Sequence, residues 1–313
     1  MNRQAGDHDG PWLRLLAGPA GPLRLRIVCF PPAGAGHASF AALWQAAPPW
    51  AECIAVQLPG RGQRLTEPSA RSIGPLADRI TAALSEQVIR CAVPYVLLGH
   101  SMGALLGYEV AARLEALPWR SPSLAIAVSA NAPQHVARLA QAQRSDDLTG
   151  FLRRMGAPAE LFASPELLGL ALDALRADRV ALRGYRFAGR VLSMPLDVRY
   201  GSDDDLLDRT AIGAWAALST ARTAIRQFPG GHFFIDKHYP AAELKLAIGS
   251  PAHQVARAVL PPPGAVRVGH EAGRRGGRAA EIPGGHRLAA DAQLADGADG
   301  DFRACQAAHS GGR

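Results

Sequence analysis

The stretch that decides the fold is "YVLLGHSMGALLGYEVAARL", residues 95–114. It opens on a continuous apolar run, typical of a strand buried on both faces of a parallel sheet, and continues from Met102 as a helix. Between the two parts, Gly99, Ser101 and Gly103 fit the pattern G-x-S-x-G. A serine on a sharp strand-to-helix turn is lifted clear of the sheet, and side chains at the two glycine positions would collide with that turn. The sequence therefore predicts Ser101 as an exposed nucleophile.

Working outward from this turn, strand-like and helix-like segments alternate along most of the chain. The predicted strands are 24–30, 52–58, 95–100, 123–130, 195–201 and 224–228. Apolar residues recur at helical spacing over 73–90, which predicts an amphipathic helix. Alternating strands and helices favour a mostly parallel sheet with helices on both faces, an α/β fold. The sequence does not show a convincing strand over 135–185, so we expect an all-helical lid there; an ordinary helical packing layer is the alternative.

Composition excludes several classes of protein. The chain has 313 residues, 48% of them hydrophobic, and no uninterrupted apolar run reaches the roughly 20 residues of a membrane span. Acidic residues and arginines interrupt the N-terminus, so no signal peptide is predicted and we expect a cytoplasmic protein without membrane contact. The net charge of +7 comes from scattered arginines, which does not indicate nucleic-acid binding. The four cysteines show no CxxC spacing and predict buried free thiols rather than disulfides or a metal site.

A serine hydroxyl needs a base to take its proton, and in this fold class the chain order is serine, acid, histidine. His232 in "FPGGHFF" follows the last predicted strand and is the expected base, while His100 is expected to pack beneath the turn. The other candidate bases, outside this strand-then-turn context, are His37, His135 and His238. The stretch "VRYGSDDDLLD" offers four candidate acids, Asp203, Asp204, Asp205 and Asp208, and spacing alone does not choose among them. Most of these would cap a helix or face solvent.

The oxyanion formed during acyl transfer needs two N–H donors. The first turn of the helix supplies one, from Met102, together with the positive end of the helix dipole. The loop "FPPAGAGHASF" after the first predicted strand is placed to supply the second, although it also reads as a plain strand-to-helix turn.

With these motifs assembled, the chain resembles the type II thioesterases of the α/β-hydrolase superfamily, which accompany nonribosomal peptide and polyketide synthases. The resemblance covers residues 25–236 and rests on "CFPPAGAGHASF", "QLPGRGQR", "LLGHSMGALLGYEVA", "YGSDDDL" with Trp215 downstream, and "FPGGHFF". It implies an α/β-hydrolase fold with a helical lid between the strand at 123–130 and the acid strand.

The resemblance also implies a function and a set of roles. Ser101 would be the nucleophile, His232 the base and Asp204 the orienting acid, with the N–H groups of Ala33 and Met102 forming the oxyanion hole. The implied activity is hydrolysis of misprimed or stalled acyl and aminoacyl thioesters on phosphopantetheine arms, so the partners would be acyl or peptidyl carrier protein domains. No cofactor of its own is expected, since the substrate carries the phosphopantetheine, and we expect a monomer.

Two features depart from the family pattern. Pro32 replaces a histidine that often occurs in the corresponding "FPHAGG" stretch, which alters the pocket rim and preserves a backbone donor. After residue 236 the usual amphipathic ending is lost, although 240–248 retains the pattern of a short helix. The predicted organisation is therefore an N-terminal segment (1–23), a catalytic domain (24–236) and a disordered tail (237–313). A frameshift near 236–240 would explain the tail, and a genuine divergent extension is the alternative.

Two other functions stay open at this point. The chain could be another serine hydrolase, such as a carboxylesterase or a peptidase, because the nucleophile turn is common to many of them. It could also be a non-catalytic module that docks carrier proteins, a reading favoured by the unusual C-terminus and opposed by the complete set of serine, aspartate and histidine.

Overall fold

The computed structural model describes residues 12–45, 47–88, 93–117, 121–142, 147–154 and 157–235, without the side chain of residue 42. The expected disordered tail over 237–313, the short helix over 240–248 and His238 lie outside the described residues. Among the residues within these ranges, none belongs to a helix long and apolar enough to cross a membrane.

Seven strands form one sheet in the order β1-β3-β2-β4-β5-β6-β7. The strands are β1 (Leu13–Ala17), β2 (Leu25–Phe30), β3 (Ala51–Val56), β4 (Tyr95–His100), β5 (Leu124–Val128), β6 (Leu196–Gly201) and β7 (Thr223–Phe228). All neighbouring pairs are parallel except β1 with β3, which is antiparallel. The predicted mostly parallel α/β sheet is thereby confirmed, and all six predicted strands are present.

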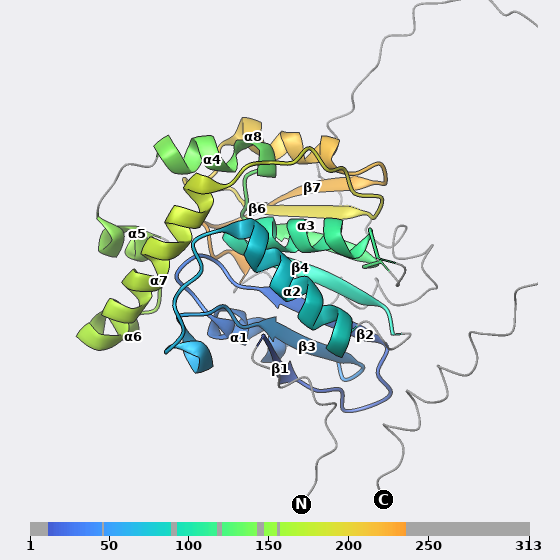
Figure 1. Ribbon diagram of the computed structural model, residues 1–313, viewed down its shortest axis with the longest axis horizontal. Helices are drawn as coiled ribbons and strands as arrows, with labels where there is room; N and C mark the ends of the chain where they lie inside the picture. Colours follow the sequence, from blue (N-terminus) through green and yellow to red (C-terminus); the bar gives the residue numbers. More distant parts are fainter. Residues whose placement is uncertain are drawn as a thin grey trace, which may run out of the picture.

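Helices fill the connections between the strands. The α-helices are α1 (Ala41–Gln45), α2 (Ile73–Gln87), α3 (Met102–Leu114), α4 (Pro133–Ala142), α5 (Leu148–Arg154), α6 (Ala159–Ala163), α7 (Pro165–Gly184) and α8 (Arg209–Gly213). Short 3-10 helices are η1 (His37–Phe40), η2 (Gly62–Arg64) and η3 (Ala214–Leu218). Figure 1 shows α2 and α3 in front of the sheet and α1 behind it.

The central strands are buried on both faces, which explains their continuous apolar runs. Because side chains alternate along a strand, β2 sends Val28 and Phe30 toward α2 and α3. It sends Ile27 and Cys29 to the opposite face, where Phe40 of η1 packs. The two cysteines of the described core, Cys29 and Cys53, are buried and free, as predicted. Burial raises the pKa of the Cys53 thiol to about 12 and that of Cys29 well above its usual value.

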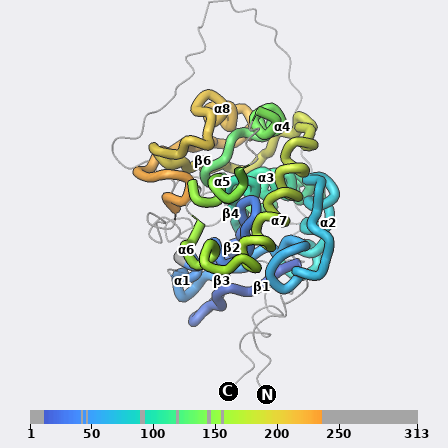
Figure 2. The backbone as a smooth tube through the Cα atoms, turned by 90° about the vertical axis from the view of Figure 1, so that its left-hand side faces the viewer, coloured from blue at the N-terminus to red at the C-terminus, as the bar shows by residue number. Residues whose placement is uncertain are grey.

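Four helices, α4 to α7, connect β5 to β6, in the region where the sequence predicted a helical insertion. They gather at one end of the sheet in Figure 1, and in Figure 2, which looks onto that end, α5, α6 and α7 lie in front of the strands. α7 begins as predicted, with Ser164 as the N-cap accepting from the Leu167 amide and Pro165 in the first turn. These helices therefore cover the edge of the sheet at which β4 ends and Ser101 follows.

The sequence did not predict β1, which lies within the N-terminal segment set at 1–23. Leu13 pairs with Val56 and Ala17 with Cys53, so this segment contributes the edge strand of the sheet. The stretch is interrupted by Arg14 and followed by glycine and proline, so its pattern is not that of a buried strand. Pairing with β3, the burial of Leu13 and the packing of Leu15 and Leu16 against the two core clusters make it part of the core.

This observation leads to a prediction for Leu13, whose side chain is 0% exposed. We expect Leu13→Ala to lower the free energy of unfolding by about 2–5 kcal/mol, because it removes buried methyl groups and leaves a cavity. Urea denaturation followed by circular dichroism measures the change. A loss below about 0.5 kcal/mol, the level typical of surface substitutions, would mean that β1 is not part of the stable fold.

Candidate active site

Ser101 lies at the junction of β4 and α3 in an unusual backbone conformation. Its φ is 56° and its ψ is −117°, a region that non-glycine residues rarely occupy. The Ser101 amide donates to the Val128 carbonyl of β5 (2.8 Å), and the Ser101 carbonyl accepts from the Ala104 amide (3.0 Å). These two hydrogen bonds hold the turn between its strand and its helix, and Ser101 itself is only half-buried.

The flanking glycines are required because backbone comes close on both sides of the turn. A Cβ atom at Gly99 would lie 2.3 Å from the Gly103 carbonyl oxygen, inside the first turn of α3. A Cβ atom at Gly103 would lie 1.9 Å from the Phe30 carbonyl oxygen at the end of β2. The predicted collision therefore exists at both positions, although at Gly103 the obstacle is the neighbouring strand rather than the turn itself.

His232 and Asp204 meet across two neighbouring loops at the same edge of the sheet. Asp204 follows β6 and His232 follows β7, and these strands are paired. Nδ1 of His232 lies 2.9 Å from Oδ2 and 3.1 Å from Oδ1 of Asp204, and both side chains are buried. Since a carboxylate only accepts, Nδ1 carries the proton, and Nε2 is the nitrogen able to accept one. This is the tautomer that a general base requires.

The structure distinguishes among the four candidate acids. Asp203 and Asp205 are exposed, and Asp208 is the N-cap of α8, accepting from the amides of Thr210 and Ala211. The hydrogen bond from the Thr210 hydroxyl, and secondarily those two amide hydrogen bonds, lower the pKa of Asp208. Of the four, Asp204 is the one that contacts His232. Its Oδ1 also accepts from the Leu206 amide (3.2 Å), which fixes the carboxylate within its loop.

Ser101 and His232 line the same cavity of about 100 Å³. A proton can therefore pass between the His232 ring and a group bound in this cavity. Nε2 of His232 is buried and has no hydrogen-bond partner among the described residues. Most of the wall is apolar. The lining residues are Ala33, Ser101, Met102, Leu105, Ser129, Ala130, Asn131, Val136, Leu139, Ala140, Phe151, Leu175, Arg179, Leu182, Leu206, Leu207 and His232. The helices α4, α5 and α7 supply seven of them, so the predicted helical insertion forms one wall of the cavity.

The two expected oxyanion donors also lie on this cavity. Met102 is the first residue of α3 and Ala33 follows the end of β2, and both line the space beside Ser101. Gly34, the residue after Ala33, donates its amide to Asp178 (2.8 Å). The Gly34 amide is therefore already committed, which agrees with Ala33 as the donor in this loop.

His100 has a larger role than the packing position predicted for it. It is buried as expected, and its Nε2 donates to the backbone carbonyl oxygen of His232 at 2.9 Å. The two imidazole rings lie 4.9 Å apart. Because this bond holds the backbone of His232 to the strand that leads into Ser101, His100 couples the two ends of the site. A contact across 132 residues leaves no local signal in the sequence.

Two further polar residues of the cavity were missed by the sequence analysis. Ser129 follows β5 with φ 47° and is buried. The Asn131 side chain accepts from the Asp208 amide (2.9 Å), and so supports the loop that carries Asp204. The feature of the sequence that could have identified Ser129 and Asn131 is their position directly after a buried strand. The alternative bases His37 and His135 do not line the cavity.

Among the residues that the structure describes, no group of three or more His, Cys, Asp or Glu side chains is arranged to hold a metal ion. The polar side chains of Ser101, His232 and Asp204 gather at this edge of the sheet, with the backbone amides of Ala33 and Met102 beside them.

The first prediction from this site concerns the close approach at Gly103. Gly103→Ala would place a methyl group on the Phe30 carbonyl, which belongs to a central strand and cannot move away cheaply. We expect little soluble folded protein, or folded protein without hydrolase activity. Gly107→Ala, in the same helix, is the matched control, because its Cβ would meet the Phe30 ring at an ordinary 3.6 Å. Equal yield and activity of both variants would contradict the steric account.

A second prediction concerns pH. Burial, and secondarily the facing His232, lowers the pKa of His100 well below 6.5. Below about pH 6.5 the unfolded chain binds a proton at His100 that the folded chain does not bind. The free energy of unfolding therefore falls as the pH drops below this value. We expect His100 to contribute a slope approaching about 1.4 kcal/mol per pH unit. Urea unfolding of wild type and His100→Gln between pH 7.5 and pH 5 measures it; identical slopes would contradict the prediction.

Comparison with known proteins shows which family this chain resembles. A family model described as "Thioesterase domain" matches residues 25–243. The probable cadicidin biosynthesis thioesterase of Streptomyces griseus is 35% identical over 246 residues, covering 78% of this chain and 67% of the relative.

Two solved structures are also similar. The type II thioesterase BorB from the borrelidin biosynthetic cluster superposes with a TM-score of 0.66 at 28% identity, covering 80% of this chain and 98% of BorB. The RedJ thioesterase from the prodiginine pathway of Streptomyces coelicolor superposes with a TM-score of 0.65 at 29% identity, covering 79% of this chain and 97% of RedJ.

Proposed function

This chain belongs to the thioesterase family, and we propose that it hydrolyses acyl or aminoacyl thioesters from the phosphopantetheine arm of carrier proteins in a natural-product synthase. The observation that carries the proposal is the arrangement around His232. Its Nδ1 is held by Asp204 at 2.9 Å, and its Nε2 is unpaired within the described residues and opens on the cavity that Ser101 lines. A nucleophile, an oriented base and an acyl-sized space thus occur together.

The proposed reaction has two halves. Ser101 Oγ attacks the thioester carbonyl carbon while His232 Nε2 takes its proton, and Asp204 stabilises the imidazolium. The oxyanion of the tetrahedral intermediate accepts hydrogen bonds from the amides of Ala33 and Met102. The C–S bond then breaks, and the imidazolium protonates the departing carrier thiolate. A water molecule, deprotonated by His232, attacks the acyl-enzyme in the same way and releases the carboxylic acid and free Ser101.

The cavity and the relatives support the substrate class. The cavity beside Ser101 has a largely apolar wall, which suits the hydrocarbon part of an acyl group. BorB is a type II thioesterase of a biosynthetic cluster, and the Streptomyces griseus relative is named for cadicidin biosynthesis. Relatives that belong to biosynthetic clusters favour a thioester formed during such a biosynthesis over a free ester as the substrate.

The test is hydrolysis of a panel of acyl-loaded carrier proteins, with acetyl at the short end. We expect wild type to release the short groups and Ser101→Ala to lose at least about a thousandfold in rate, since the nucleophile is removed. We expect Asp204→Asn to lose on the order of a thousandfold, because the amide no longer selects the productive tautomer. Liberated carrier thiol is measured directly.

Asp205→Asn is the matched control, because Asp205 is the exposed neighbour of Asp204 and should tolerate the same substitution. Simple esters cleaved faster than loaded carriers would favour a carboxylesterase instead. Protein that neither labels at Ser101 with a serine-directed phosphonate nor turns over any thioester would favour a non-catalytic carrier-binding module.

A further inference from the structure

A buried carboxylate of the helical insertion contacts the loop that holds the proposed oxyanion donor. Asp178 of α7 is 2% exposed. Its Oδ2 accepts from the Gly34 amide (2.8 Å) and from one terminal nitrogen of Arg61 (2.7 Å), and its Oδ1 accepts from the other terminal nitrogen (2.8 Å). The first of these Arg61 nitrogens also donates to the Ala35 carbonyl (3.2 Å). The bidentate ion pair therefore holds the loop at two points: Asp178 binds the Gly34 amide, and Arg61 binds the carbonyl of the next residue, Ala35.

The same part of α7 packs directly on this loop. Gly34 adopts a left-handed conformation with φ +75°, and a Cβ atom added there would lie 3.1 Å from the Leu175 Cβ. Leu175 is fully buried and lines the acyl cavity. The turn at Gly34 thus lies between the Asp178 carboxylate, the Arg61 guanidinium and the Leu175 side chain, without room to rotate.

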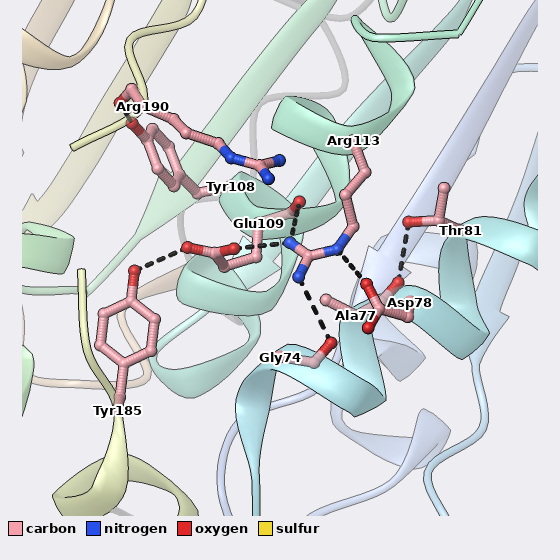
Figure 3. A network of polar contacts seen from close by, with 9 residues as sticks. All are labelled: Gly74, Ala77, Asp78, Thr81, Tyr108, Glu109, Arg113, Tyr185 and Arg190. Atoms are coloured by element: carbon pink, nitrogen blue, oxygen red, sulfur yellow. Dashed lines mark hydrogen bonds and ion pairs between the residues drawn. The ribbon is translucent and has the colours of Figure 1, made fainter. Parts of the chain in front are cut away.

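The far end of α7 is anchored to the body of the protein as well. The Tyr185 hydroxyl, just after the helix, donates to Glu109 of α3 at 2.7 Å. Arg113 binds the other oxygen of Glu109 at 2.6 Å and also contacts Asp78 of α2, as Figure 3 shows. With both the Asp178 region and the Tyr185 end attached, α7 is a fixed wall on which a loop can be positioned.

We propose that Asp178, oriented by Arg61, is a positioning residue for the oxyanion hole, which rests on the proposed function. The peptide between Ala33 and Gly34 is held through the Gly34 amide. The preceding peptide, which carries the Ala33 amide, is held through the Pro32 carbonyl, which accepts from the Ala35 amide (3.2 Å). The direction of the Ala33 amide follows from these two restraints. A charged acceptor gives stronger hydrogen bonds than a neutral one, so the turn is set before substrate arrives.

The effect on the reaction follows from where the charge develops. Oxyanion donors act on the transition state more than on the ground state. A misplacement on the order of 1 Å costs up to about a hundredfold in rate. Loosening the Gly34 turn should therefore lower kcat while leaving KM nearly unchanged.

The competing interpretation is that Arg61 and Asp178 form an ion pair that serves stability alone. The two can be separated because a buried ion pair can be replaced by apolar residues of similar volume without loss of stability. An Arg61→Met/Asp178→Leu double variant removes both charges and the acceptor for the Gly34 amide. Under the stability interpretation, kcat recovers together with the melting temperature; under the proposal, it does not.

The experiment measures kcat, KM and melting temperature for wild type, Asp178→Asn, the double variant and Glu52→Gln. Glu52 is the matched control, because it forms an equally buried ion pair with Arg26 (3.0 Å) near the amino end of β3, away from the site. We expect Asp178→Asn to lower kcat about 10- to 100-fold, with KM changed less than about threefold. We expect the double variant to have a higher melting temperature than Asp178→Asn, because Arg61 no longer leaves an unpaired buried charge, and yet to be equally slow. We expect Glu52→Gln to lose stability without losing kcat.

Recovery of kcat in the double variant would overturn the proposal, as would an Asp178→Asn kcat within about twofold of wild type or an equal kcat loss in Glu52→Gln. Labelling of Ser101 by a phosphonate and hydrolysis of a simple acetyl ester are measured in parallel. If wild type cleaves the ester but no loaded carrier, the carrier assignment fails and the same comparison on the ester still decides the role of Asp178. Wild type that neither labels nor hydrolyses any substrate overturns both proposals.

Discussion

The site depends on one close backbone contact, where the first turn of α3 lies against the carboxyl end of β2. Gly103 can approach the Phe30 carbonyl only because it has no side chain. This approach sets the position of Ser101, in a conformation that a free chain would avoid. It also brings the start of α3 beside Ala33, so Ser101 and both proposed oxyanion donors are placed by the same crossing of helix and strand. Parallel pairing of β2 with β4 makes that crossing rigid.

The remaining groups arrive through contacts that connect distant loops at the same sheet edge. Asp204 orients His232 from the neighbouring loop, and His100 holds the His232 backbone from the strand that carries Ser101. Asp178 reaches the Gly34 turn from the helical insertion. Each of these contacts uses a buried polar group whose loss would leave an unpaired partner, which is costly in a dry interior. The chemistry is thus supported by groups that do not touch the reacting atoms.

The sequence predicted the parts of this arrangement that have local patterns. The apolar run and the spaced glycines around Ser101 identified the fold class and the strand-to-helix turn that carries Ser101, and the strand-then-turn context pointed to His232. Spacing alone could not choose among four aspartates within six residues, because the choice depends on which carboxylate faces a loop 28 residues away; Asp204 followed only from the family resemblance. The sequence analysis missed β1, whose pattern is too short and interrupted, and it missed the link between Arg61 and Asp178, which are 117 residues apart. Such contacts exist only once the topology is formed.

Helix α7 both lines the cavity and holds the loop at Gly34, which affects any attempt to change the substrate range of this protein. Leu175 lines the acyl cavity, while Asp178, one turn further along the same helix, fixes the loop at Gly34. Any redesign that enlarges the cavity by shifting α7, rather than by trimming a single side chain, also displaces that loop. Selectivity for acyl size and speed of turnover are therefore mechanically linked in this scaffold, and broader substrate range achieved by moving the helix comes with slower chemistry. Trimming Leu182 or Val136, which also border the cavity, offers a route that leaves the linkage alone.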